Sequence, residues 1–180
     1  WDVSNVTNFS YMFNYANSFD GDIGNWDVSS GTSFDYMFYG ATSFNQDIGD
    51  WDVSSATDFS MMFFDARSFN SDISKWDMSN AQNIGGMFWR ADLFNQDISS
   101  WDVSSVLGFF QIFKDATSFN QDLSAWNNNS ESTGYTDMFS GATEMLANQG
   151  VVATPNASYF IGETTDGTNN AETLNGAAGN

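Results

Sequence analysis

The sequence predicts a repeat solenoid, in which short units of similar sequence stack to form one continuous core. Two observations carry this prediction. Apolar residues recur at the same positions in every unit, and Trp opens five units at a constant interval: Trp1, Trp26, Trp51, Trp76 and Trp101. A fixed period of about 20–50 residues is typical of solenoids, whose units bury their apolar faces only by stacking.

Each unit contains two kinds of local pattern. The segment 34–41 has apolar residues at i, i+3, i+4 and i+7, which predicts a short helix. The segment Trp26–Val28 alternates apolar and polar residues, which predicts a short strand. We therefore expect one short strand plus one short helix per 25-residue turn, with the repeated Trp, Met and Phe forming internal ladders.

The regular pattern weakens towards the C-terminus. Five repeats occupy residues 1–125, and a sixth copy that begins at Trp126 lacks the Asp-Val-Ser found after most of the earlier Trp residues. We interpret 126–160 as a degenerate sixth repeat and C-terminal cap. Residues 161–180 are rich in Gly, Thr, Asn and Ala and have no periodicity, which indicates a flexible tail or linker.

The composition excludes several classes of function. The net charge is −19, with four basic residues and neither His nor Cys. Nucleic-acid binding needs clustered Lys and Arg, and no apolar run is long enough to insert into a membrane. Without His there is no evident base to activate a Ser. Paired acids would suit a glycosidase, but these acids recur identically in every unit whereas an active site is singular. We expect a protein that is not an enzyme.

Two columns of Asp run through the repeats. One column directly follows each Trp, and the other directly precedes each Ile or Leu: Asp2, Asp27, Asp52, Asp77 and Asp102, then Asp22, Asp47, Asp72, Asp97 and Asp122. Stacked carboxylates repel one another and need compensation. The favoured interpretation is hydrogen bonding to turn amides and Ser hydroxyls. The alternative is Ca²⁺ held between turns, the only cofactor that the sequence suggests.

The aromatic residues divide into two groups. One Trp per turn at a constant position indicates a core residue rather than a platform for sugar stacking. Another position, directly after a core Phe, varies from unit to unit: Asn14, Tyr39, Phe64, Trp89 and Lys114. We expect this variable position to point outward, so that Tyr39, Phe64 and Trp89 form an exposed aromatic binding surface.

The stretch MFYGATSFNQDI from Met37 to Ile48, with WDVS from Trp51 to Ser54, resembles a known repeat. It is similar to the bacterial surface-protein repeat family DUF285, related to BspA-like leucine-rich repeats. The resemblance covers about residues 1–144 and implies a leucine-rich-repeat-like solenoid on a cell surface. The family offers no catalytic residues to transfer to this chain.

These observations lead to two functional hypotheses. The first is a non-enzymatic extracellular surface module for adhesion or ligand recognition, with a protein or glycan as the ligand. The second is a structural subunit of an extracellular filament or surface layer, assembled from copies of itself through solenoid ends or faces.

Overall fold

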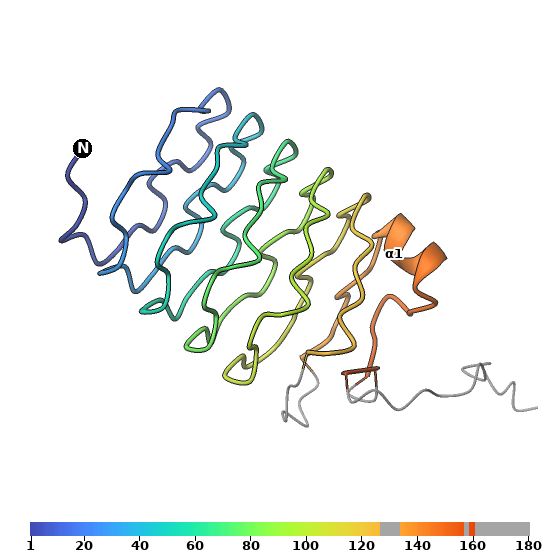
Figure 1. Ribbon diagram of the computed structural model, residues 1–180. Helices are drawn as coiled ribbons and strands as arrows, with labels where there is room; N and C mark the ends of the chain where they lie inside the picture. Colours follow the sequence, from blue (N-terminus) through green and yellow to red (C-terminus); the bar gives the residue numbers. More distant parts are fainter. Residues whose placement is uncertain (127–133, 157–158, 161–180) are drawn as a thin grey trace, which may run out of the picture.

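The chain follows a stack of similar loops (Figure 1). In this computed structural model the described residues are 1–126, 134–156 and 159–160. Each repeat unit makes one loop, and we call residues 1–25, 26–50, 51–75, 76–100 and 101–125 coils 1 to 5. The expected tail at 161–180 lies outside the described residues.

Backbone hydrogen bonds join each coil to the next. In coil 2 the amides of Phe34, Tyr36, Phe38 and Gly40 donate to carbonyl oxygens of coil 3 at 2.7–2.9 Å. The amides between them turn back within the coil, as Met37 N does to Phe34 O at 3.2 Å. Every second amide therefore holds neighbouring coils together, and the others close tight turns.

The segment 34–41 does not form the expected helix. It is a run of turns, and the α-helix that the described residues contain is α1 (Thr143–Asn148). Tyr36 has a φ of 57°, in the left-handed region, and half of the amides bond to the next coil instead of to residue i−4. The apolar spacing nevertheless identified the inward side chains, because Phe34, Phe38 and Ala41 are fully buried.

The expected strand at Trp26–Val28 is also not formed. Parallel pairing occurs later in the units of coils 1 to 4, as single bridges that link Asn8 to Ser33, Ser33 to Asp58 and Asp58 to Asn83. The alternation at Trp26–Val28 reflects side chains that point inward and outward from an extended backbone. Extended backbone without ladder hydrogen bonds has the same alternation as a strand.

Aromatic ladders fill the core. Trp51 stacks on Trp76 at 6.4 Å between ring centroids, and Trp101 stacks on Trp126 at 6.3 Å. Within coil 2, Phe38 stacks on Phe44 at 3.9 Å. These rings are buried, so the recurring Trp belongs to the interior in coils 3 to 5 and at Trp126.

The two ends of the stack differ. At the C-terminal end, Met145 of α1 is buried, and Phe160 stacks on Tyr135 and Phe109 at 5.0 and 5.7 Å. On coil 1, Trp1 is 91% exposed. No helix in the described ranges combines the length and apolar character needed to cross a membrane.

Candidate functional site

The Asp column after each Trp lies at the surface and closes turns. Asp27 Oδ1 accepts the Ser29 amide at 3.2 Å and the Ser29 hydroxyl at 2.6 Å. The same amide contact, two positions along the chain, is made by the other four members: Asp2, Asp52, Asp77 and Asp102. The hydrogen bonds from Ser29 hold the pKa of Asp27 below its ordinary value.

The second Asp column repeats this geometry. Asp97 Oδ1 accepts the amide and hydroxyl of Ser99 at 3.0 and 2.7 Å. The corresponding amide contacts are made by Asp22, Asp47, Asp72 and Asp122. Across the described ranges, no three acidic side chains converge as a metal site. Calcium binding stays a prediction, which melting curves with Ca²⁺ and with chelator would test.

Three of the positions that vary from coil to coil lie together on one face of the stack, which we call the turn face. It consists of the eleventh, fourteenth and fifteenth residues of each coil: Tyr11, Asn14, Tyr15, Tyr36, Tyr39, Gly40, Met61, Phe64, Asp65, Gly86, Trp89, Arg90, Gln111, Lys114 and Asp115. Core positions keep nearly the same residue in every coil, whereas these positions carry aromatic, charged, polar and small residues.

The backbone of the turn face is in an unusual conformation. Among the described residues, nine non-glycine residues have φ between 53° and 61°: Tyr11, Tyr15, Tyr36, Met61, Asp65, Arg90, Gln111, Asp115 and Asp137. Eight of them belong to the turn face, and Asp137 follows in the sixth unit. An L-residue in this region costs about 1–2 kcal/mol relative to its favoured conformations, a cost that Gly avoids. Residues with side chains therefore occupy positions at which Gly would have lower backbone strain.

Gly40 makes room on this face for a neighbouring side chain. Its φ is 69°, and a Cβ added there would lie 2.8 Å from Cδ1 of Tyr15. The Tyr15 ring therefore lies over the Gly40 backbone, at an angle of 72° to the Tyr39 ring. In the same way, Met61 of coil 3 covers Gly86 of coil 4.

Six aromatic side chains form a continuous surface, which we call the ring strip: Tyr11, Tyr15, Tyr36, Tyr39, Phe64 and Trp89. Tyr39 stacks on Phe64 at 4.3 Å, and Phe64 meets Trp89 at 5.0 Å and 80°. The structure thus brings together the three residues expected at the variable position. Tyr36 lies 5.5 Å from Tyr39 and links them to Tyr11.

Sequence reasoning missed the three tyrosines Tyr11, Tyr15 and Tyr36. A signal for two of them was present, because Tyr11 and Tyr36 occupy the same position in successive repeats. Their rings stack at 4.8 Å, and Tyr11 is 52% exposed. A hydrogen bond with Tyr15 and burial raise the pKa of Tyr39 to about 12, so this phenol stays neutral at physiological pH.

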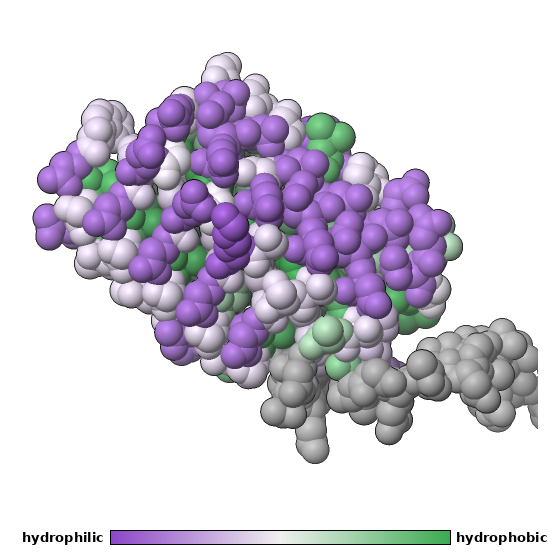
Figure 2. All heavy atoms as spheres, in the orientation of Figure 1, coloured by the Kyte–Doolittle hydropathy of each residue, from purple (hydrophilic) through white to green (hydrophobic). Residues whose placement is uncertain are grey.

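Three of the chain's four basic residues lie on or beside the turn face in coils 3 to 5: Arg67, Arg90 and Lys114. Asp65 lies between two of them, 2.9 Å from Arg67 and 3.4 Å from Arg90. Lys114 pairs with Asp137 at 3.1 Å. Ion pairs therefore join the aromatic rings on the turn face in coils 3 to 5, whereas coils 1 and 2 contribute tyrosines to it. Figure 2 shows strongly hydrophilic residues interspersed with residues of intermediate hydropathy over the side in view.

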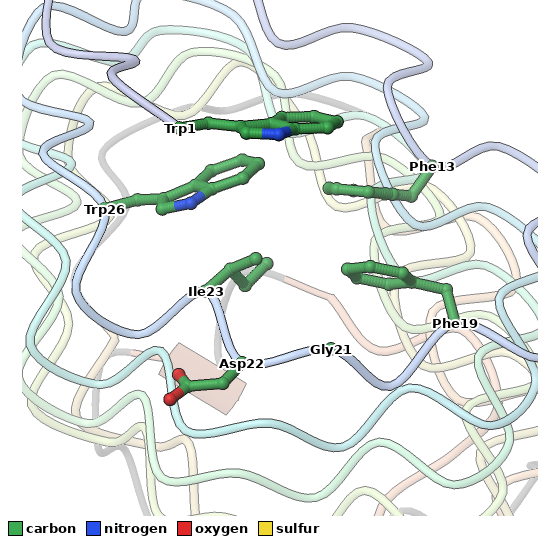
Figure 3. Close-up of a pocket in the computed structure, with 7 residues that line it drawn as sticks. All are labelled: Trp1, Phe13, Phe19, Gly21, Asp22, Ile23 and Trp26. Carbon is green, nitrogen blue, oxygen red and sulfur yellow. The ribbon is translucent and has the colours of Figure 1, made fainter.

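A separate hollow of about 210 Å³ opens at coil 1. In Figure 3 the rings of Trp1 and Trp26 lie on one side, and those of Phe13 and Phe19 on the other. Its one ionisable side chain, Asp22, points its carboxylate away from the rings (Figure 3). The hollow is part of the uncovered core surface of coil 1 and has no grouping suited to catalysis.

Comparisons with known proteins give one family. A family model described as "Mycoplasma protein of unknown function, DUF285" matches residues 1–92 and, in a second overlapping match, residues 50–151. No curated protein and no solved structure matches the chain. The resemblance inferred from the repeated sequence is confirmed, and the protein belongs to the DUF285 family.

Proposed function

We propose that this protein is a non-enzymatic, leucine-rich-repeat-like solenoid of the cell surface that serves adhesion or ligand recognition through its turn face. One observation carries the proposal. Two of the three variable positions of the turn face, the eleventh and the fifteenth of each coil, hold eight non-glycine residues at positive φ. Strained backbone conformations cluster at functional sites, where the side chain is worth its conformational cost.

The composition of the turn face supports recognition rather than packing. Tyr, Trp and Arg, which dominate protein interfaces, occur here at partly exposed positions. The rest of the repeated surface is formed mainly by Asp, Ser and Asn that bond to turn backbone. A repeated framework with one variable face is also how other solenoids present a binding surface.

The filament hypothesis concerns the assembly of copies of this chain through solenoid ends or faces. End-to-end assembly requires two complementary end surfaces. Assembly of either kind stays a prediction, and electron microscopy over a range of salt and Ca²⁺ concentrations tests it.

The test of the recognition proposal is binding to intact cells and to immobilised extracellular proteins and glycans. The triple variant Tyr39→Ala, Phe64→Ala, Trp89→Ala removes three rings of the strip. We expect it to lose at least about tenfold in apparent affinity, because each anchor ring of an interface contributes about 1 kcal/mol or more.

The matched control is Leu93→Ala, an exposed apolar side chain outside the turn face. It is expected to bind within about twofold of the unmodified protein. Melting curves of both variants verify that the stack remains folded. If the folded triple variant binds as tightly as the unmodified protein, the turn face is not the binding surface.

A further inference from the structure

One cation already lies on the ring strip. Lys114 Nζ is 4.9 Å from the centroid of the Trp89 ring and 3.1 Å from Asp137 Oδ2. The Trp89 indole N–H donates to Asp115 Oδ2 at 3.2 Å. An ammonium group is thus held by an aromatic ring and a carboxylate together, and a second carboxylate fixes the ring. Ammonium groups are attracted to the electron-rich faces of aromatic rings.

A cluster formed by Tyr11, Tyr36, Asp35 and Asp58 repeats the aromatic and acidic parts of this arrangement without the cation. Tyr11 and Tyr36 stack there, the Tyr11 amide donates to the Asp35 carbonyl oxygen at 3.1 Å, and Asp58 is bridged to Ser33, two residues before Asp35. Burial raises the pKa of Tyr11, and the charges of Asp35 and Asp58 act in the same direction. No Lys or Arg precedes Arg67 in the sequence. In the described part of the chain, neither Asp35 nor Asp58 takes part in an ion pair.

We propose that the ring strip of coils 1 to 3, with Asp35 and Asp58 beside it, binds Lys and Arg side chains of a basic segment in a partner protein. The inference rests on the proposed function, since it assigns a ligand class to the same face. The partner's cations lie against the exposed parts of Tyr11 and Tyr15, and the nearby carboxylates neutralise them.

The ring geometry favours a protein segment over a glycan. A sugar stacks on a free ring face, but Tyr11 and Tyr36 are stacked at 6° and Tyr39 and Phe64 at 10°. Much of each ring face is therefore used by its neighbour. Tyr11 and Tyr15 nevertheless stay 52% and 64% exposed, and long flexible Lys and Arg side chains can reach this remaining ring surface and the phenol oxygens.

The charge of the whole molecule acts in the same direction. A net charge of −19 attracts cationic partners and accelerates their association. This long-range attraction does not choose a face, because the Asp columns are also exposed. The aromatic rings determine which face binds the partner, because the exposed rings are concentrated on the turn face.

The test uses a short synthetic peptide of alternating Arg and Gly, with binding measured by calorimetry at low and moderate salt. A matched peptide has citrulline, the uncharged isostere, in place of Arg. We expect binding of the Arg peptide that weakens as salt rises, and at least about tenfold weaker binding of the citrulline peptide.

Two double variants separate the rings from the general negative charge. Tyr36→Leu with Tyr39→Leu keeps apolar bulk but removes two rings, and is expected to weaken Arg-peptide binding about five- to thirtyfold. Asp27→Asn with Asp52→Asn removes two charges from the column after Trp, and is expected to change binding by less than about twofold. Equal loss in both double variants would overturn the proposal, because binding would then follow charge alone.

The variant Lys114→Met provides an independent test of the proposal. It vacates the Trp89 ring and Asp137, which extends the cation-binding surface by one site. We expect the Arg peptide to bind at least about threefold more tightly to this variant. Unchanged or weaker binding of the Arg peptide would show that the partner's cations do not bind where Lys114 contacts Trp89.

The outcomes also separate this inference from the proposed function. Loss of cell binding in the Tyr39, Phe64 and Trp89 variant, with no binding of the Arg peptide to the unmodified protein, overturns the cationic ligand and leaves the turn face as the recognition surface. If a glycan competes with cells for binding and the Arg peptide does not, the cationic ligand is likewise overturned and the turn face is left as the recognition surface. Cell binding that is independent of the ring strip overturns both.

Discussion

The indole Nε1 of Trp76, at the start of coil 4, donates a hydrogen bond of 3.0 Å to the carbonyl oxygen of Ile48, near the end of coil 2. The same bond, between a Trp and the residue 28 positions earlier, is made by Trp51, Trp101 and Trp126. Each buried Trp thus packs its ring inside the stack and satisfies a carbonyl group that has been removed from water.

Trp76→Phe removes this donor and part of the ring. We expect it to lower the free energy of unfolding by about 2–4 kcal/mol, because a buried carbonyl loses its partner and a cavity remains. Denaturant unfolding measures the change. Trp1→Phe is the control, since Trp1 is 91% exposed, and should cost under about 0.5 kcal/mol. Similar losses in both variants would contradict the structural role of the Trp ladder.

Gly40→Ala tests the packing of the turn face. Gly40 has a φ of 69° and lies under the Tyr15 ring, 2.8 Å from the position of an added Cβ. Gly150 has a φ of 66° with no atom within 4 Å of that position. We expect Gly150→Ala to cost about 1 kcal/mol from backbone strain alone, and Gly40→Ala to cost at least about 1 kcal/mol more. Calorimetric melting compares them, and equal destabilisation would argue against the contact.

Gln111→Gly tests whether side chains on the turn face are retained against a conformational cost. Gln111 has a φ of 55°, and its side chain makes a long hydrogen bond of 3.4 Å to Asp137. We expect Gly at this position to leave stability unchanged or to raise it by up to about 1 kcal/mol. The free energy of unfolding from urea titration gives the answer. A clear loss of stability would mean that Gln111 is a packing residue.

Asp97 tests the compensation of charge in the Asp columns. Hydrogen bonds from the hydroxyl and amide of Ser99 hold its pKa below the ordinary value of 3.8. A carboxyl whose pKa is lower in the folded state contributes stability that is present above 3.8 and is lost as pH falls through the folded pKa. NMR titration of Ser99→Ala should show the pKa of Asp97 rising towards 3.8.

The control for this titration is Ser105→Ala. The Ser105 hydroxyl donates to Ser79 O at 2.7 Å, so its removal should leave the pKa of Asp97 unchanged. An identical pKa for Asp97 in the unmodified protein and in Ser99→Ala would exclude the Ser99 hydroxyl as the cause.

The sequence predicted which side chains are buried better than it predicted the backbone that buries them. Phe38 and Ala41 are inward as expected, but the segment that contains them is a run of turns. Side-chain periodicity reports the direction in which residues point. It does not reveal that the amide of Phe38 donates to Met62 in the next coil, because such a bond depends on stacking between coils.

The candidate site was predictable only in part, for a similar reason. Tyr39, Phe64 and Trp89 share one repeat position, so the register alone brings them together. Tyr15 occupies a different position, and its contact with Tyr39 depends on the positive φ of Tyr15 and on the missing side chain of Gly40. Neither feature is visible in a pattern of apolar and polar residues.

Oxidative footprinting of the ring strip, with and without intact cells bound, tests the recognition account most directly. We predict that bound cells protect Tyr15, Tyr36 and Trp89 from hydroxyl-radical oxidation and leave Trp1 and Leu93 as reactive as in the free protein. Protection of Trp1 or Leu93, with the ring strip unchanged, would place the binding surface elsewhere and contradict the account.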